Sequence, residues 1–315
     1  MTGERGPFWL FPPAEPFVAA DTASYLVLYK PPRIHSVPLR EGEGGTLLHW
    51  AASRFPEILR VRGRKPGEGG LLHRLDYETQ GLLAAAKTQA AWDSLAAQQE
   101  AGEFVKEYEA FSAGPAEIMP GFPPPPSVPA AEAAGTGLIE SAFRPWGRGR
   151  KAVRPLPADP SGTSGGALYR TDICSRRPVP VPVPPEAADR TVPDEAETAG
   201  QPGQPDQSLM SFRLRIARGF RHQIRCHLAW IGAPILNDPL YGGKPLPATG
   251  KGFLALRASG LFFRDPESGE GREYRADLFD NPVGYLTVLA VSRLTAAKRA
   301  FFSGNCSETE VSEQL

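Results

Sequence analysis

A single aspartate, Asp76, is the clearest candidate for chemistry in this sequence. It lies in the run His-Arg-Leu-Asp-Tyr-Glu-Thr-Gln-Gly-Leu-Leu at positions 73–83. A second run, Gly-Phe-Arg-His-Gln-Ile-Arg-Cys-His-Leu at positions 219–228, carries Arg221 and Arg225 one helical turn apart. A carboxylate that a guanidinium keeps ionised is a common reactive acid, base or nucleophile. Only a folded domain can join two runs so far apart; otherwise Asp76 and Arg74 form an ordinary buried ion pair.

Other kinds of site have weaker support in the sequence. His222 and Cys226 have the spacing to share a metal, but a structural zinc site needs about four ligands, and the remaining candidates lack paired spacing. A serine hydrolase would need a Gly-X-Ser-X-Gly elbow between a strand and a helix, and no such elbow supports that reading. A two-carboxylate glycosidase would need a second acid facing Asp76, and nothing sets the direction of the nearest one, Glu78. The sequence therefore favours no metal and leaves the glycosidase open.

A short basic stretch surrounds Trp146. It holds five cations and no acid: Arg144, Arg148, Arg150, Lys151 and Arg154. Basic residues with an interleaved aromatic bind phosphates and stack a base. A solvated loop or a charged edge strand explains the same pattern equally well.

The composition limits the class of protein. The chain has 315 residues, with 35 Lys plus Arg and 35 Asp plus Glu, so any nucleic-acid site must be local. Three widely spaced cysteines argue against a disulfide framework and fit a reducing compartment. Neither a signal peptide nor a long apolar segment is evident, so we expect a cytoplasmic protein with no membrane contact.

The order of elements favours an α+β fold, because strands and helices alternate without a steady βαβ rhythm. Thr88 is expected to cap a helix that ends at Gly102. The segment 81–86 fits either a strand or a buried helix. Other expected elements are strands at 25–29, 104–111 and 211–217, a helix at 224–231, and a hairpin of 253–263 with 273–278.

The domain organisation follows from proline content and polarity. We expect an N-terminal extension at 1–19, a catalytic domain at 20–302 and a flexible tail at 303–315. A proline-rich insertion at 176–208 is expected to be disordered or on the surface, because it lacks apolar residues and cannot join a sheet interior.

Several blocks of sequence, taken in order, resemble the RluA-type pseudouridine synthases. The first run, from His73 to Lys87, resembles the motif of their catalytic aspartate. Lys30-Pro31 resembles their opening turn, and 106–110 resembles the segment with the active-site tyrosine. The block 222–227 resembles their arginine motif, and the blocks 232–235 and 238–242 resemble the segment next to that motif.

The resemblance implies an RNA isomerase that converts uridine to pseudouridine without metal or cofactor. It implies the pseudouridine synthase catalytic fold: a mixed, mostly antiparallel sheet with flanking helices and a central active-site cleft. The expected substrate is a loop or bulge uridine in ribosomal or transfer RNA, because the base must leave its stack. The protein is expected to act as a monomer.

The resemblance also implies residue roles. Asp76 is the essential carboxylate, which either attacks C1′ or removes a sugar proton. Arg225 is its ion-pair partner, and Tyr108 stacks on the uracil. Ile224 packs against the base, and Arg74 supports the gap left by the flipped nucleotide or contacts the backbone. The implied substrate-binding set is Arg74, Ile224, His73, His222, Gln223, Arg221, Arg150 and Lys151, and Arg213 and Arg215 are also expected at phosphates.

The chain departs from the family pattern at several positions. Phe220 stands where an arginine is usual, and Arg221 follows one place later, which puts a phosphate contact in doubt. Gln80 replaces a usual serine, and Arg33 replaces a usual glycine. No S4-type RNA-binding domain is expected. These departures leave an alternative, a catalytically weak RNA-binding or assembly protein that keeps the fold.

Overall fold

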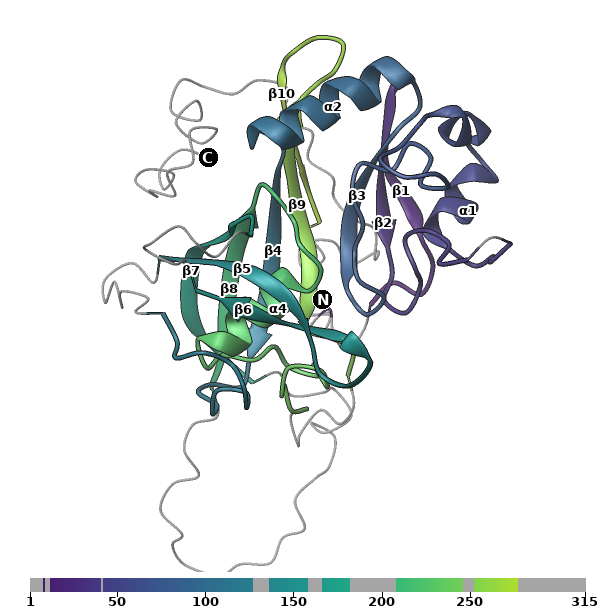
Figure 1. Ribbon diagram of the computed structural model, residues 1–315. Coiled ribbons are helices and arrows are strands. Elements are labelled where there is room, and N and C mark those ends of the chain that lie inside the picture. Colours follow the sequence, from purple (N-terminus) through teal and green to yellow (C-terminus); the bar gives the residue numbers. More distant parts are fainter. Residues whose placement is uncertain are drawn as a thin grey trace, which may run out of the picture.

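The computed structural model describes residues 8, 12–40, 42–126, 136–157, 166–181, 208–245 and 252–276. These residues form one large sheet with strand order β1-β2-β3-β9-β4-β8-β7-β5-β6, and β10 pairs with β9 (Figure 1). Only β3 and β9 are parallel among these strand pairs. The expected α+β fold with a mixed, mostly antiparallel sheet is confirmed.

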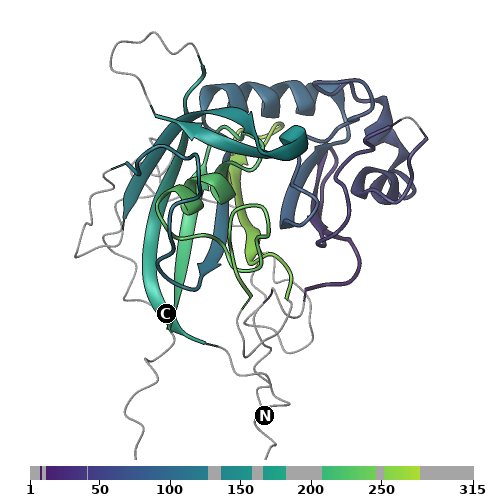
Figure 2. The same cartoon turned by 60° about the horizontal axis from the view of Figure 1, so that its bottom comes forward.

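The elements divide between two sides of the molecule. The first half of the chain gives β1 (Phe17–Asp21), β2 (Tyr25–Lys30), α1 (Leu47–Ala52), η1 (Pro56–Arg60), β3 (Gln80–Ala86), α2 (Gln89–Ala101) and β4 (Val105–Ser112). The rest of the described chain gives β5 (Gly137–Trp146), η2 (Arg148–Arg150), β6 (Ala152–Leu156), β7 (Tyr169–Pro180), β8 (Ser208–Ile216), α4 (Gln223–Trp230), β9 (Leu256–Arg264) and β10 (Gly271–Arg275). Figures 1 and 2 show β1–β3 with α1 on one side, β5–β8 with α4 on the other, and β4 and β9 between them.

The two sides are joined where β3 lies beside β9. Gly81 pairs with Ala258 and has a φ of 122°. A Cβ at position 81 would lie 2.3 Å from the Ala258 carbonyl oxygen, so only glycine fits there. This close approach fixes how the loop before β3 sits relative to β4 and β8.

Local sequence signals set the helix ends. The Thr88 side chain accepts from the Ala91 N–H and starts α2, and Gly102, with φ 77°, ends it, as expected. The segment 81–86 is a strand, and its small residues let α2 pack closely over β3 and β9 (Figure 1). Among the described residues, no helix combines the length and apolar character needed to cross a membrane.

The alternation of apolar and charged residues in β8 decides on which face of the sheet its arginines lie. Phe212, Leu214 and Ile216 are buried in the core, as their period-2 spacing predicts. Arg213 and Arg215 therefore point to the opposite face, and the active-site cleft is lined by neither. Arg215 Nε donates to Glu107 Oε2 at 2.9 Å. The expectation that Arg213 and Arg215 meet phosphates stays a prediction, and such phosphates would lie outside the cleft.

Two expected boundaries also shift. β1 begins at Phe17 and pairs with β2, so the sheet starts inside the expected extension of 1–19. Arg176–Pro180, expected within the insertion, instead forms the end of β7 and pairs with Ser208–Phe212. Prolines are tolerated there because β5 stops pairing with β7 at Ile173, which leaves this stretch as an edge. Residues 182–207 and the tail at 303–315 lie outside the described residues.

His227 fastens α4 to the sheet and makes stability depend on pH. Its ring bonds Ser141 Oγ at 3.0 Å and Thr171 Oγ1 at 2.8 Å, and burial lowers its pKa to about 3. The unfolded chain binds a proton near pH 6.5, so the free energy of unfolding should fall as pH falls from 6.5 toward 3, by up to about 1.4 kcal/mol per pH unit for this group. Urea unfolding at pH 7, 6, 5 and 4 measures this slope.

His227→Gln is the control for that slope. The carboxylates and His73, whose pKa burial also lowers to about 3, contribute equally in both proteins. The free energy of unfolding of the variant should therefore fall less steeply with falling pH, and the difference in slope should correspond to about one bound proton. Parallel curves for the two proteins would contradict the assignment.

Candidate active site

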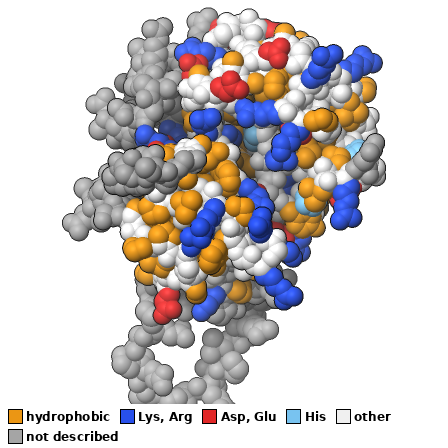
Figure 3. All heavy atoms as spheres, viewed as in Figure 1, with side chains coloured by type: hydrophobic (Ala, Val, Ile, Leu, Met, Phe, Trp, Pro, Cys, Tyr) orange, Lys and Arg blue, Asp and Glu red, His pale blue; other side chains and the backbone are white. Residues whose placement is uncertain are grey.

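A cleft of about 660 Å³ lies between the two sides of the molecule. It is lined by the loop that carries Asp76, by Tyr108 on β4 and by the first residues of α4. This volume lies within the usual range for ligand sites, about 300–1,000 Å³. Figure 3 shows Lys and Arg side chains gathered across the middle of this face.

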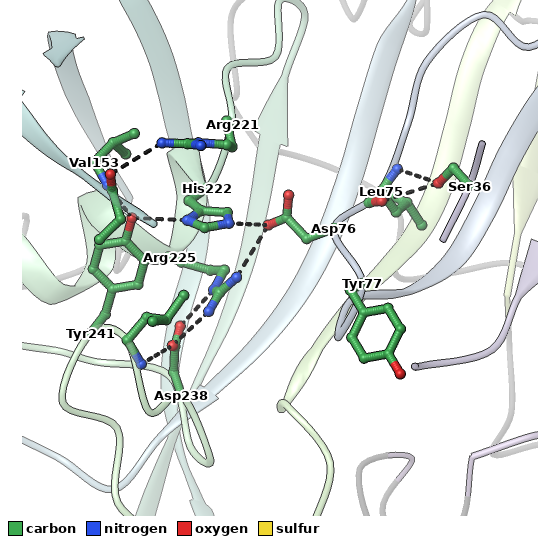
Figure 4. A network of polar contacts seen from close by, with 12 residues as sticks. Ser36, Leu75, Asp76, Tyr77, Val153, Arg221, His222, Arg225, Asp238 and Tyr241 are labelled. Carbon is green, nitrogen blue, oxygen red and sulfur yellow. Dashed lines mark hydrogen bonds and ion pairs between the residues drawn. The ribbon is translucent and has the colours of Figure 1, made fainter. Parts of the chain in front are cut away.

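Asp76 and Arg225 meet in the cleft from opposite sides (Figure 4). Arg225 Nη1 lies 3.4 Å from Asp76 Oδ2, although the two residues are 149 positions apart in the chain. The Arg225 side chain is 4% exposed, whereas that of Asp76 is 25% exposed. The carboxylate therefore reaches the open cleft while its partner lies behind it, as the sequence predicts.

Asp238 is the closer partner of Arg225. Arg225 Nε donates to Asp238 Oδ2 at 2.7 Å, and Nη2 donates to Oδ1 at 2.8 Å, a two-bond pairing (Figure 4). Burial opposes the charged guanidinium, but the hydrogen bonds and charge of Asp238, with the charge of Asp76, raise the pKa of Arg225 above its ordinary value. Asp238 therefore fixes the arginine that faces Asp76.

His222 forms a second contact behind Asp76. Its Nε2 lies 3.8 Å from Asp76 Oδ2, and its Nδ1 lies 3.1 Å from the Tyr241 hydroxyl. Burial, only partly offset by Asp76, lowers the pKa of His222, so the ring is neutral at pH 7. Tyr241 also accepts from the Val153 N–H at 2.9 Å, so its hydroxyl links His222 to β6.

Lys30 and Ser36 hold the loop that carries Asp76. Lys30 Nζ donates to the carbonyl oxygens of Pro31, Ile34 and Tyr77 at 2.9, 2.9 and 3.3 Å. Ser36 Oγ both accepts from the Leu75 N–H and donates to its carbonyl oxygen, each at 3.0 Å. The turn after β2 thus fixes the residues on both sides of Asp76.

Tyr108 forms a flat apolar wall of the cleft. It is buried in the main core, and burial followed by the charge of Asp76 raises its pKa, so the phenol stays protonated at neutral pH. Ile224, the second residue of α4, is also buried and lines the same cleft. Together they offer a stacking surface beside a carboxylate.

The comparison with known proteins decides the family. The sequence profile described as RNA pseudouridylate synthase matches residues 24–230 of the 315, which is more than half of the chain. The chain belongs to the RNA pseudouridylate synthase family. The resemblance seen in the sequence is confirmed, and the protein is an enzyme of the RNA isomerase class.

Relatives and a solved structure agree with this assignment of the synthase. Ribosomal large subunit pseudouridine synthase D of Escherichia coli (strain K12) is 26% identical over 275 residues, 84% of this chain and 67% of that protein. An uncharacterized RNA pseudouridine synthase of Chloroflexus aurantiacus is 29% identical over 235 residues, 74% of this chain and 57% of that protein. Human RNA Pseudouridylate Synthase Domain Containing 1 shares the fold, with a TM-score of 0.53 and 16% identity over 92% of this chain and 96% of that chain.

The remaining residues expected to contact the substrate of the synthase differ in where they lie relative to the cleft. Arg74 and His73 line the cleft, and Arg74 is half exposed and 3.5 Å from Glu68. Gln223 also lines the cleft, and its amide bonds Phe220, Arg170 and Thr171, so it supports the loop, while its contact with substrate stays a prediction. Arg150 and Lys151 are exposed at η2, between β5 and β6, outside the residues that line the cleft.

Phe220 joins an aromatic cluster in the synthase. Its ring stacks on Phe143 with centroids 5.0 Å apart and planes at 8°, and Tyr169 lies 5.0 Å away. Arg221 Nη2 donates to the carbonyl oxygens of Arg150 and Ala152 at 2.9 and 3.2 Å. The loop before α4 is therefore fastened to the β5–β6 hairpin by aromatic packing and by an arginine one position later than usual.

Phe220→Ala should loosen this loop in the synthase. Loss of the half-buried ring is expected to lower the free energy of unfolding by about 2 kcal/mol. Turnover should also fall, because His222 and Arg225 follow directly. Urea unfolding and single-turnover assays measure the two effects, with Phe220→Tyr as a control that keeps the ring. Wild-type stability in Phe220→Ala would contradict the packing role.

The partners of the residues around Asp76 do not fit a glycosidase site or a metal site. The group that faces Asp76 is Arg225, and Glu78 lies 3.6 Å from Arg33 instead. Cys226 and His222 turn to different partners, the Val153 carbonyl oxygen and Tyr241.

Three residues of this site were not assigned a role from the sequence: Asp238, Tyr241 and Lys30. All lie in blocks that resemble the family, but a buried acid and a buried lysine in turns give no local signal of what they contact. The one available sign is that Asn237-Asp238 lies between the apolar run 233–236 and Pro239, where an unpaired carboxylate would be costly to bury.

Proposed function

We propose that this synthase isomerises uridine in ribosomal RNA, with Asp76 as the catalytic carboxylate. One observation supports the residue: Asp76 Oδ2 lies 3.4 Å from Arg225 Nη1 in a cleft that Tyr108 also lines. The substrate class follows the relatives, several of which are named ribosomal large subunit pseudouridine synthase D.

The reaction breaks the N1–C1′ bond of uridine and forms a C5–C1′ bond. The uracil turns between the two steps, the C5 proton leaves, and N1 gains a proton. Asp76 starts the reaction either by attack on C1′ or by removal of a proton from the sugar, and both routes need an ionised carboxylate. Its partly exposed oxygens and buried partners fit either route.

Arg225 and His222 keep Asp76 charged and aimed. Arg225 supplies a fixed positive charge behind the carboxylate, and the neutral His222 places its Nε2 3.8 Å from the same oxygen. Such partners act more strongly in a site with little water than on a surface. The carboxylate needs no reorganisation when charge develops on the sugar.

Tyr108 holds the uracil by stacking. A base stacked on one aromatic side chain gains about 1–3 kcal/mol. Because the pKa of Tyr108 is raised, its phenol is protonated at neutral pH and is a poor general base. The side chain acts instead as a stacking surface and hydrogen-bond donor. Ile224 lines the same cleft and packs against the base.

The substrate uridine is expected in a loop or bulge. Flipping a base costs a few kcal/mol in a duplex and less where stacking is already weak. Arg74 is 52% exposed at the side chain and lines the cleft, so it is placed to fill the gap or contact the backbone.

The test uses purified protein with an unmodified transcript of large-subunit ribosomal RNA and with transfer RNA transcripts. Pseudouridine is mapped at single-nucleotide resolution before and after incubation. We expect one or a few modified positions in the ribosomal transcript. Modification of transfer RNA alone would contradict the ribosomal target, and no modification of either would contradict the proposed function.

A further inference from the structure

One lysine of the cleft forms neither a hydrogen bond nor an ion pair within the described part of the chain. Lys106 on β4 is 5% exposed and lines the cleft. Buried Arg225 and Arg257 each pair with a carboxylate, and buried Lys30 bonds three carbonyl oxygens. Neither kind of partner reaches Lys106 within the described part of the chain. The Lys106 side chain is mostly buried, but its ammonium group has neither a carboxylate nor a carbonyl partner, so it is suited to an anionic ligand.

The ammonium group faces open space at the edge of the cleft. Lys106 Nζ lies 4.0 Å from where a Cβ would be at Gly219, in the loop between β8 and α4, and this glycine also lines the cleft. Because position 219 carries no side chain, the approach to the ammonium stays open. The Phe104 ring lies on another side, with its centroid 5.9 Å from Nζ.

Lys106 also lies at a suitable distance from the stacking residue. It precedes Tyr108 by two residues, and the two pair with Ile216 and Leu214 on β8, so they share one face of β4. Two strand residues span about 7 Å. A uracil on Tyr108 is joined to its phosphates through one sugar, which is a separation of the same scale.

We propose that Lys106 binds the RNA backbone phosphate next to the target uridine. This inference rests on the proposed function and assigns a ligand to the end of the cleft away from Asp76. Arg64, which also lines this end, adds positive charge and is held there by a bond from its Nη2 to Gln99 Oε1 at 3.0 Å. A phosphate held by Lys106 would anchor the flipped nucleotide while Asp76 acts on its sugar.

The surroundings of Lys106 predict a pH dependence. The charged or titratable groups that act on Lys106 are Arg64 and His73. Its paired residues on the neighbouring strands β8 and β9 are apolar, Ile216 and Leu261. Burial, followed by the charge of Arg64, lowers the pKa of Lys106 to about 8. The ammonium therefore loses its proton as pH rises past 8, and the affinity for RNA should weaken between pH 8 and 9.

Binding of a labelled, unmodified large-subunit ribosomal RNA transcript tests the proposal. At pH 7, Lys106→Met should bind roughly tenfold more weakly. Its slope of log affinity against log salt should be shallower by about one. Its affinity should no longer weaken between pH 8 and 9. Lys106→Arg should retain most of the affinity, and Lys244→Met, an exposed lysine outside the cleft, should show no comparable loss.

Stability separates binding from a structural role. Removal of an unpaired buried charge should leave urea stability of Lys106→Met unchanged or higher, whereas a lysine kept for folding would lower it. Lys106→Gln is measured in parallel in case methionine does not fit. Affinity and salt slope equal to those of the wild type would overturn the proposal. That result is distinct from failure of the proposed function, which appears as absence of pseudouridine with the wild-type protein.

Discussion

Asp76→Asn should lower turnover by at least about 10³-fold and leave RNA affinity within about twofold. The amide keeps the shape of the side chain but can neither attack C1′ nor take a proton. Affinity should persist because Tyr108 and the cations of the cleft remain. Single-turnover conversion of the ribosomal RNA transcript and a binding titration measure the two quantities.

Glu78→Gln is the matched control for this change. Glu78 is an acid two positions away, but it lies 3.6 Å from Arg33 and outside the residues that line the cleft. Its replacement should leave turnover near that of the wild type. Full modification by Asp76→Asn would remove Asp76 from the mechanism, and an equal loss in both variants would point to a general charge effect instead.

Arg225→Met should reduce both turnover and stability. Asp238 is fully buried and would lose its two-bond partner, which is expected to cost about 3–5 kcal/mol in the free energy of unfolding. Turnover should fall far more than RNA affinity, because Asp76 loses the charge behind it. Adding Asp238→Asn should restore more than half of the lost stability without restoring turnover, since Asn keeps an oxygen for the Leu240 N–H. Urea unfolding and single-turnover assays are carried out on the wild type, the two single variants and the double variant.

Arg215→Met controls for loss of a buried ion pair elsewhere. Arg215 pairs with buried Glu107 on the face away from the cleft, so its loss should lower stability but not the turnover of folded protein. Recovery of turnover in the double variant would refute the catalytic role of Arg225. Equal losses of turnover and RNA affinity in Arg225→Met would also count against it.

The sequence predicts the elements of this fold well because their signals are local. The alternation of β8, the cap at Thr88 and the glycine at 102 each act within a few residues. The pairing of Asp76 with Arg225 could be expected only through resemblance to a family, because it joins two sides of a sheet whose strand order no local pattern encodes.

The errors of the sequence analysis have physical causes. Arg176–Pro180 was expected outside the sheet, but an edge accepts proline where a central strand does not. The role of Asp238 stayed hidden because it depends on a partner 13 residues away, met only in three dimensions.

The short parallel junction at Gly81 has a consequence for how the enzyme gains activity. Strand β3, on the side that supplies Asp76, pairs there with β9 through two residue pairs, Gln80 with Arg257 and Gly81 with Ala258. These contacts span much of the polypeptide and are slow to form, since the loop they close is long. The pairing of Asp76 with Arg225 therefore depends on this junction, because it sets the loop before β3 against the strands on the other side.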